Sequence, residues 1–275
     1  FESTQAELLL AHRRVGPLSG LLGLSQQSRE VTGSGALRYL PNVDTRSQAV
    51  FLKETLDFDW ASFDAGVRHE RVEHTLRPSS FKTARNSANT ALQDRDFRLN
   101  SYSIGSYVEL GPLFAAKLRY SSSQRAPEIN ELYASNAHYS VMTQEEGNQN
   151  LDPERAKNLE LTGLFHLGGF QLSATAYRMR YENYLYLGYS GLQTANRLPL
   201  KYWKQTDTTV KGFEVDASQS LTLGRFGRRG APGFAHLENN KADRPDTQGG
   251  KRDGENQPST PPNLYGGTPQ CRCEG

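Results

Sequence analysis

Residues 121–160 read SSSQRAPEINELYASNAHYSVMTQEEGNQNLDPERAKNLE and contain the clearest structural signals in the chain. The strand-like run before Pro127 ends there, because proline cannot donate a hydrogen bond to a sheet ladder. A polar stretch follows, and Asp152-Pro153 is a typical turn starter ahead of a new alternating run. The segment therefore predicts a long loop between two β-strands.

On both sides of this segment, apolar and polar residues alternate with a period of two, which is typical of β-strands with one apolar face. In residues 114–121, phenylalanine, alanine, leucine and tyrosine fall on one face, and charged or small side chains fall on the other. Helical periodicity is weak throughout. Further segments with the same alternation are 63–68, 158–166, 170–176 and 213–218, and residues 18–31 and 45–57 alternate less clearly.

The connections between these segments alternate between short and long. Short turns are predicted near 15–17, 59–60, 111–112 and 168–169, and long links at 32–44, 77–95, 126–155 and 185–207. Loops beyond about 12–15 residues are uncommon in compact domains, whereas membrane barrels combine tight turns at one end with long loops at the other. Strand alternation alone also fits a soluble sandwich. The loop rhythm favours an all-β, antiparallel transmembrane β-barrel fragment of about nine long strands, with short periplasmic turns and long extracellular loops.

Composition limits the possible functions. Lys+Arg number 32 and Asp+Glu 30, and the net charge of +2 gives no reason to expect a nucleic-acid partner. No apolar run is long enough for a transmembrane helix. The motifs G-x-S-x-G and H-E-x-x-H and the phosphate loop do not occur, so we expect no enzyme. The only cysteines, Cys271 and Cys273, are too few for a zinc site.

Two parts are predicted: a partial barrel over residues 1–223 and an irregular tail over 224–275. The tail is rich in Gly, Pro, Asp and Arg, which is typical of loops or disorder, with one short strand near 233–237. A frameshifted or disordered end is one hypothesis for it. Phe1 is not an initiator methionine, so either a preceding segment was removed or the sequence starts inside a longer gene. We expect the second, because the first residues already have the pattern of a strand.

The quoted segment resembles the barrel of TonB-dependent outer-membrane receptors. Residues 125–133 match the family pattern R-A-P-x-x-x-E-L-[FY], and 147–154 match G-N-P-N-L-x-P-E except that Gln149 replaces the usual proline. A weaker match to V-x-G-x-E lies at 210–214, where Gly212 is expected to relieve crowding on the lumen face. We interpret the matching residues as structural: Arg125, Ala126, Pro127, Glu131, Leu132, Tyr133, Asn150, Leu151, Pro153, Glu154 and Glu160.

The resemblance implies a location in the outer membrane of a Gram-negative bacterium and a barrel of about 22 strands closed by a plug domain. It implies import of a metal ion or metal chelate (zinc, siderophore or haem), outer-membrane lipid and the TonB–ExbB–ExbD complex as partners, and no cofactor. No plug domain, energy-coupling box or closing strand is visible, so the fragment alone is not expected to transport. The alternatives are a soluble or secreted β-structured binding or adhesin module, and a barrel enzyme with its catalytic groups on loops.

One candidate metal site lies in the long loop. Residues 135–138 and 41–47 resemble stretches of receptors linked to zinc uptake, and His138 with Glu145 and Glu146 could form part of a transient site. The alternative is a solvated histidine with acidic neighbours, since zinc needs three or four ligands. His69 and His74 are five residues apart, so on one strand they face opposite sides and do not chelate together.

Charged and aromatic side chains give two further predictions. A basic lumen that attracts anionic chelates is predicted from Lys117, Arg119, Arg178 and Arg180. The equally weighted alternative is ordinary ion pairing with Glu109, Glu160 or Glu182. Tyr181, Tyr184, Tyr186 and Tyr189 are predicted to anchor the barrel at the outer membrane interface. The alternative is that they stack against a ligand.

Overall fold

The computed structural model describes residues 1–33, 38–77, 92–220, 222–223, 228–229 and 233–243. These residues form strands almost throughout. The long strands are β1 (Glu2–Ala11), β2 (Leu18–Val31), β3 (Val43–Asp57), β4 (Ala61–Leu76), β5 (Arg95–Glu109), β6 (Phe114–Arg125), β9 (Glu154–Leu167), β10 (Phe170–Gln193), β11 (Pro199–Gln219) and β14 (Gly233–Asp243). The short elements are α1 (Ile129–Tyr133), β7 (Ala137–His138), β8 (Thr143–Glu146), β12 (Thr222–Leu223) and β13 (Arg228–Arg229). Within the described ranges, no helix has the length and apolarity to cross a membrane.

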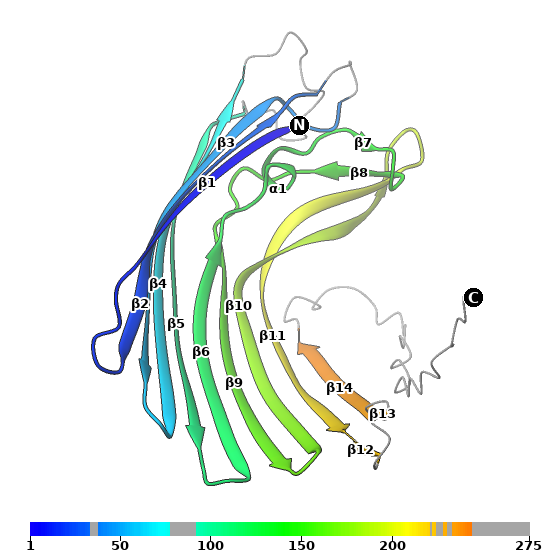
Figure 1. Cartoon of the computed structure of the whole chain (residues 1–275). Coiled ribbons are helices and arrows are strands. Elements are labelled where there is room, and N and C mark those ends of the chain that lie inside the picture. Colours follow the sequence, from blue (N-terminus) through cyan, green and yellow to red (C-terminus); the bar gives the residue numbers. More distant parts are fainter. Residues whose placement is uncertain (34–37, 78–91, 221, 224–227, 230–232, 244–275) are drawn as a thin grey trace, which may run out of the picture.

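The long strands form one curved sheet that wraps around a concave face (Figure 1). The 12-stranded sheet has the order β1-β2-β3-β4-β5-β6-β9-β10-β11-β8-β7, and β14 also pairs with β11. Neighbouring long strands are antiparallel, and only the short β8 runs parallel to its partner β11. The predicted all-β barrel fold is confirmed. The described residues form ten long strands, close to the predicted number of about nine, although β5 was not among the segments identified from alternation.

The register of the strands separates two faces. Val72 and Leu99 lie beneath α1 in the buried core, so their parity marks the concave side. Residues of the opposite parity form a continuous apolar band on the convex side, as the alternation predicts. The band includes Leu8, Leu10, Leu22, Leu24, Val50, Leu52, Phe63, Val67, Ile104, Leu118, Leu161, Phe213 and Leu237, each 38–59% exposed.

The band has the dimensions of a bilayer-facing surface. On β9 it runs from Leu159 to Leu167, which is about 27 Å along the strand. Apolar bands of outer-membrane barrels are about 25 Å tall. In the part of the chain that the structure describes, no second layer covers this face (Figure 1), so the sandwich alternative is not supported.

Connection lengths follow the predicted rhythm at one end of the sheet and depart from it at one place. Strand pairs β3–β4, β5–β6 and β9–β10 are joined by short turns at the lower end in Figure 1. The predicted long link at 185–207 is wrong, because β10 and β11 continue as a hairpin with a turn at only 194–198. The turn is closed by hydrogen bonds from Thr194 N to Leu198 O (2.9 Å) and from Leu198 N to Thr194 Oγ1 (3.2 Å). Alternation is weak in this hairpin because β10 and β11 extend here beyond the apolar band, so their strand character was not visible in the sequence.

The tail contains one long strand. β14 pairs with β11 over eleven positions, from Gly233↔Gln219 to Asp243↔Thr209. It is longer than the short strand expected near 233–237, and the boundary at 223 stays a prediction. Apart from β13, the rest of the tail, with its two cysteines, lies outside the described residues.

Gly212 on β11 has the predicted role. A Cβ at Gly212 would lie 2.5 Å from the hydroxyl oxygen of Tyr177 and 2.6 Å from the carbonyl oxygen of Asn239. These neighbours belong to β10 and β14, so the glycine allows Tyr177 to lie across β11 on the concave side. The interpretation that Gly212 relieves crowding on the lumen face is confirmed.

Candidate functional site

Residues 126–153, here called the inner loop, fold back across the concave face at the upper end of the sheet (Figure 1). The loop contains α1, β7 and β8. The main buried apolar cluster lies between α1 and the wall, with Leu132, Tyr133 and Leu151 each no more than 2% exposed. The only helix of the described chain and most of its core therefore lie where the motif residues are.

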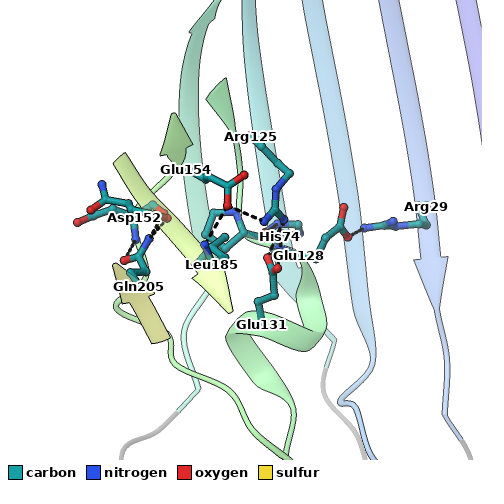
Figure 2. A network of polar contacts seen from close by, with 11 residues as sticks. Arg29, His74, Arg125, Glu128, Glu131, Asp152, Glu154, Leu185 and Gln205 are labelled. Carbon is teal, nitrogen blue, oxygen red and sulfur yellow. Dashed lines mark hydrogen bonds and ion pairs between the residues drawn. The ribbon is translucent and has the colours of Figure 1, made fainter. Parts of the chain in front are cut away.

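Arg125 ties the inner loop to the wall, as Figure 2 shows. Its guanidinium donates to both carboxylate oxygens of Glu131 (3.2 and 2.9 Å) and to Glu154 Oε2 (3.4 Å). Glu131 also accepts the backbone N–H of Glu128 (2.6 Å), which caps the start of α1. Glu154 accepts the N–H of Leu185 on β10 (2.8 Å). One arginine thus joins β6, α1, β9 and β10.

A second tie comes from β4. His74, which is 2% exposed, shares a hydrogen bond with Thr45 (2.9 Å) and another with the carbonyl oxygen of Pro127 (3.1 Å). Arg29 on β2 donates to Glu128 at 2.5 Å (Figure 2). His69 lies on the convex face and contacts Asn100 (2.8 Å), so the prediction that His69 and His74 do not chelate together is confirmed.

The G-N-Q-N-L turn packs against the end of α1. A Cβ on Gly147 would lie 2.6 Å from the backbone carbonyl of Leu132, so only glycine fits there. The N–H of Gly147 donates to Ala134 O (2.7 Å), and that of Asn148 donates to Glu131 O (2.8 Å). Arg95 then binds the carbonyl oxygen of Leu151 (3.0 Å).

The far end of the turn is held by β11. Gln205 accepts the N–H of Asp152 (3.0 Å) and donates to its carbonyl oxygen (2.7 Å), as Figure 2 shows. Leu132, Tyr133 and Leu151 are buried, and Arg125, Pro127, Glu131 and Glu154 bind the wall or α1. The structural reading of the motif is therefore consistent with the contacts.

His138, on β7 of the inner loop, belongs to a small cluster with Tyr39 and Glu145. Its ring stacks on Tyr39, with centroids 4.3 Å apart and an angle of 22° between the planes. Its Nδ1 atom lies 3.1 Å from Glu145 Oε1, and its side chain is 36% exposed while that of Glu145 is 6% exposed. Glu145 also accepts hydrogen bonds from Tyr39 and from Thr143 (3.2 Å). Burial and the Glu145 carboxylate raise the pKa of the Tyr39 hydroxyl, so Tyr39 stays a donor.

Glu146 does not share this cluster. It follows Glu145 on β8, so it faces the other side, and it accepts a hydrogen bond from Gln144 (2.7 Å). Burial raises the pKa of its carboxyl group, and the Gln144 bond opposes that shift. Among the residues with described positions, no three His, Cys, Asp or Glu side chains lie close enough together to hold a metal ion.

A polar cavity of about 210 Å³ lies under the inner loop. Arg29, Glu70 and His74 line it from the wall, and Pro127 and Glu128 line it from the loop. The cavity is open to the concave side and presents both charge signs. It is suited to water or to a polar side chain of whatever fills the concavity.

The predicted basic lumen is partly wrong. Lys117 and Arg119 lie on the concave face, where Arg119 pairs with Asp64 (3.2 Å) and not with the acidic residues expected from the sequence. Arg178 pairs across the sheet with Leu159, and Arg180 with Lys157, which places both arginines on the convex face. This face continues the even-numbered apolar face of residues 170–176, so the parity along β10 was already present in the sequence.

The tyrosine prediction also needs correction. Tyr181 shares the concave parity of Tyr177, and Tyr189 lies further along β10, beyond Arg178 and Arg180. Tyr102 and Tyr120 lie instead at the upper margin of the apolar band, with ring centroids 6.1 Å apart. These two residues occupy the position expected for an aromatic girdle.

Sequence reasoning missed three contributors to the site. Tyr39 lies 99 residues before His138, and Arg29 and His74 lie on strands far from the motif. The sequence offers one signal for Arg29 and His74: each is a hydrogen-bonding side chain at a strand position whose parity places it on the concave face. Nothing in the sequence around Tyr39 pairs it with His138.

A family model for the TonB dependent receptor-like β-barrel matches residues 12–268. The match covers most of the chain, including β14 and the inner loop. The chain belongs to the TonB-dependent receptor β-barrel family. The receptor motifs at 125–133 and 147–154 therefore have their family context, and the contacts above explain them.

Two curated relatives are named as hemoglobin-binding proteins. The chain is 28% identical over 136 residues to the hemoglobin and hemoglobin-haptoglobin-binding protein A of Haemophilus influenzae, covering 47% of this chain and 12% of that protein. It is 24% identical over 188 residues to the hemoglobin-binding protein A of the same organism, covering 56% and 18%. The chain thus spans less than a fifth of the length of these relatives.

Solved structures show the same fold. The copper transporter OprC matches with a TM-score of 0.69 and 15% identity, over 89% of this chain and 38% of that one. The hemophore receptor HasR of Serratia marcescens, solved with its hemophore HasA and heme, matches with a TM-score of 0.58 and 17% identity, over 86% and 40%. The curved sheet is therefore part of a receptor barrel wall.

Proposed function

We propose that this chain is part of the wall of an outer-membrane receptor that imports a metal ion or metal chelate, and that the chelate is haem. The observation that carries the haem proposal is the single oriented imidazole of His138. Family membership and hemoglobin-binding relatives support the receptor role. The convex apolar band supports placement in the outer membrane of a Gram-negative bacterium.

The donor set favours haem over a free zinc ion. Zinc needs three or four protein ligands, and the described residues offer no such group. Haem iron is commonly held by one histidine from the protein. His138 supplies one imidazole, so the zinc interpretation is the weaker one.

The neighbours of His138 prepare it for this role. A metal-binding histidine generally gives its other ring nitrogen to a carboxylate, which fixes the tautomer and the ring orientation. Glu145 contacts Nδ1, so Nε2 is the atom left for iron. Tyr39 stacks on the ring and limits its rotation. Glu145 is thus a positioning residue, and Glu146 is not part of the proposed ligand set.

Two further parts of the function belong to the whole receptor. Import through a barrel of this family would require the separate TonB–ExbB–ExbD complex and a plug. We place the plug in another part of the receptor. The inner loop, held by Arg125 and His74, would present His138 to the ligand from a fixed position. The secreted binding or adhesin alternative has less support, because such a module would cover its apolar strand faces, and here they are exposed.

Haem absorption of the full-length receptor in detergent tests this proposal. His138→Ala is expected to lower haem affinity at least 100-fold, and Glu145→Gln about 10-fold to 100-fold, since outer-shell partners have effects of that size. His69→Ala, on the convex face, serves as the matched control and should bind normally. Unchanged haem affinity in His138→Ala would refute the proposed role of this residue. If the native receptor binds zinc tightly and His138→Ala does not, the zinc interpretation is restored.

A further inference from the structure

The convex face carries a group of cations just above the apolar band, here called the basic patch: Arg178, Arg180 and Lys211. Arg178 on β10 is directly opposite Lys211 on β11, and Lys211 is directly opposite Lys241 on β14. The three side chains of the patch are exposed, and so is that of Lys241. Like charges directly opposite each other destabilise a sheet unless an anion lies between them.

Carboxylates do not neutralise Arg178 and Lys211, and Arg180 shares the field of Glu182 with two other cations. Within the described part of the chain, neither Arg178 nor Lys211 has an acidic group within ion-pair distance. Glu182, the nearest acid on the convex side of β10, pairs with Lys157 and lies 3.7 Å from Arg155. Asp243 lies 3.5 Å from Lys241. Positive charge is therefore in excess on this part of the surface.

The position of the patch relative to the apolar band is equally informative. One cross-strand row contains Tyr120, Leu159, Arg178 and Lys211, and the next row down contains Leu118, Leu161, Ala176 and Phe213. The cations therefore begin where the hydrocarbon-facing residues end. They also lie towards the inner-loop end of the sheet, which is the extracellular end in this family.

We propose that the basic patch binds the phosphate groups of a phosphorylated lipid in the outer leaflet, with the acyl chains against Leu159, Leu161 and Phe213. Two opposed cations and a nearby third match a phosphate, which accepts several charge-assisted hydrogen bonds. Basic clusters beside a membrane-embedded surface recognise anionic headgroups in the same way. The inference rests on the proposed placement of this sheet in the outer membrane, and it goes beyond ligand import.

The test compares lipid binding by the full-length receptor in neutral detergent, measured by native mass spectrometry. The probes are lipid A with both phosphates and the same lipid after dephosphorylation. The native receptor should prefer the phosphorylated form at least tenfold. Arg178→Gln/Lys211→Gln should lower that affinity roughly 25-fold, from about fivefold for each cation removed. Equal preference in this variant and the native receptor would overturn the proposal.

Lys53→Gln/Lys117→Gln is the matched control, because it removes the same charge from the concave face. It should leave the lipid preference unchanged. If this control loses as much affinity for the phosphorylated lipid as Arg178→Gln/Lys211→Gln, net charge alone is responsible and the proposed lipid site is refuted. Inorganic phosphate should compete no better than chloride at equal ionic strength. Stronger competition would identify a site for free phosphate and overturn the lipid assignment.

Two measurements keep the outcomes distinct. Heat-modifiable mobility in gels reports whether each barrel is folded, and Arg178→Gln alone, with a loss of about fivefold, replaces the double variant if that variant does not fold. Haem absorption by the same samples reports the proposed function separately. Normal haem binding without a phosphate preference would refute only the lipid site, and the reverse result would refute only the haem proposal.

Discussion

The convex and concave faces of the same strands show how one alternating pattern serves two environments. On β6, Leu118 is 49% exposed on the convex side, while its neighbour Lys117 faces the concavity. On the concave side at the upper end, Val72 and Leu99 are buried because the inner loop covers them. Large apolar side chains are exposed over the middle of the convex face, and most of the buried ones lie beneath the loop. The proposed contact with hydrocarbon accounts for the first, and the cover of the inner loop accounts for the second.

The sharpest way to break this comparison is to place a charge on the convex side. Leu118→Arg should destabilise the inserted barrel by about 2–3 kcal/mol, towards the lower end of the cost at the bilayer midplane, because Leu118 lies one row below the upper margin of the apolar band. Unfolding of the receptor in lipid vesicles, followed by tryptophan fluorescence, measures this. Lys117→Arg, one residue earlier on the concave face, should change stability by less than about 0.5 kcal/mol. Equal effects at both positions would mean that Leu118 does not face lipid.

The second prediction concerns the attachment of the inner loop. Arg125→Ala leaves Glu131 and Glu154 without their cation, and their side chains are 7% and 12% exposed. We expect a loss of about 2–3 kcal/mol, less than for a fully buried pair because Arg125 is 43% exposed. Hydrogen exchange should speed up in residues 126–151 and stay slow in β4–β6.

Arg71→Ala is the matched control for Arg125. Arg71 pairs with Glu73 and Asp96 on the exposed convex surface, so its loss should cost under about 1 kcal/mol. If Arg125→Ala leaves the exchange of the inner loop unchanged, the loop is held by its apolar contacts alone.

A third prediction compares two glycines. Gly147→Ala places a Cβ 2.6 Å from the backbone of Leu132, and we expect about 1–3 kcal/mol of destabilisation confined to the inner loop. Gly163→Ala, on the convex face of β9, meets no atom within 4 Å and should be neutral. Thermal unfolding with exchange mass spectrometry distinguishes local from global effects. Equal effects would contradict the close approach of α1 and the turn.

The smallest expected effect is the pH response of β8. Burial raises the pKa of Glu146, so the folded loop favours the protonated form. The resulting stabilisation is present below the ordinary pKa of glutamate, 4.5, and is lost as the pH rises through the raised value. Protection of residues 143–147, corrected for intrinsic exchange rates, should therefore fall as the pH increases from 4.5, and Glu146→Gln should flatten this trend. A trend that is unchanged in the variant would assign it to another group.

Much of the fold was predictable because it depends on local patterns. Alternation along β4, β6 and β9 identified strands and their apolar face, and Pro127 and Pro153 located the ends of the long loop. The hairpin at 185–207 was predicted wrongly, because strands that extend beyond the apolar band have no alternation to mark them. The convex position of Arg178 and Arg180 was missed although both continue the even-numbered apolar face of 170–176, because their charge suggested a position facing the pore.

The sequence by itself determined that the chain is a β-barrel wall with an apolar side, and that residues 125–154 form a family-specific loop, because strand period and turn chemistry are local properties. Only the tertiary structure decided what that loop contacts. The partners of His138, Pro127 and Glu128 are Tyr39, His74 and Arg29, which lie on distant parts of the chain. Sheet register and curvature bring these residues together, and both depend on the pairing of all the strands at once.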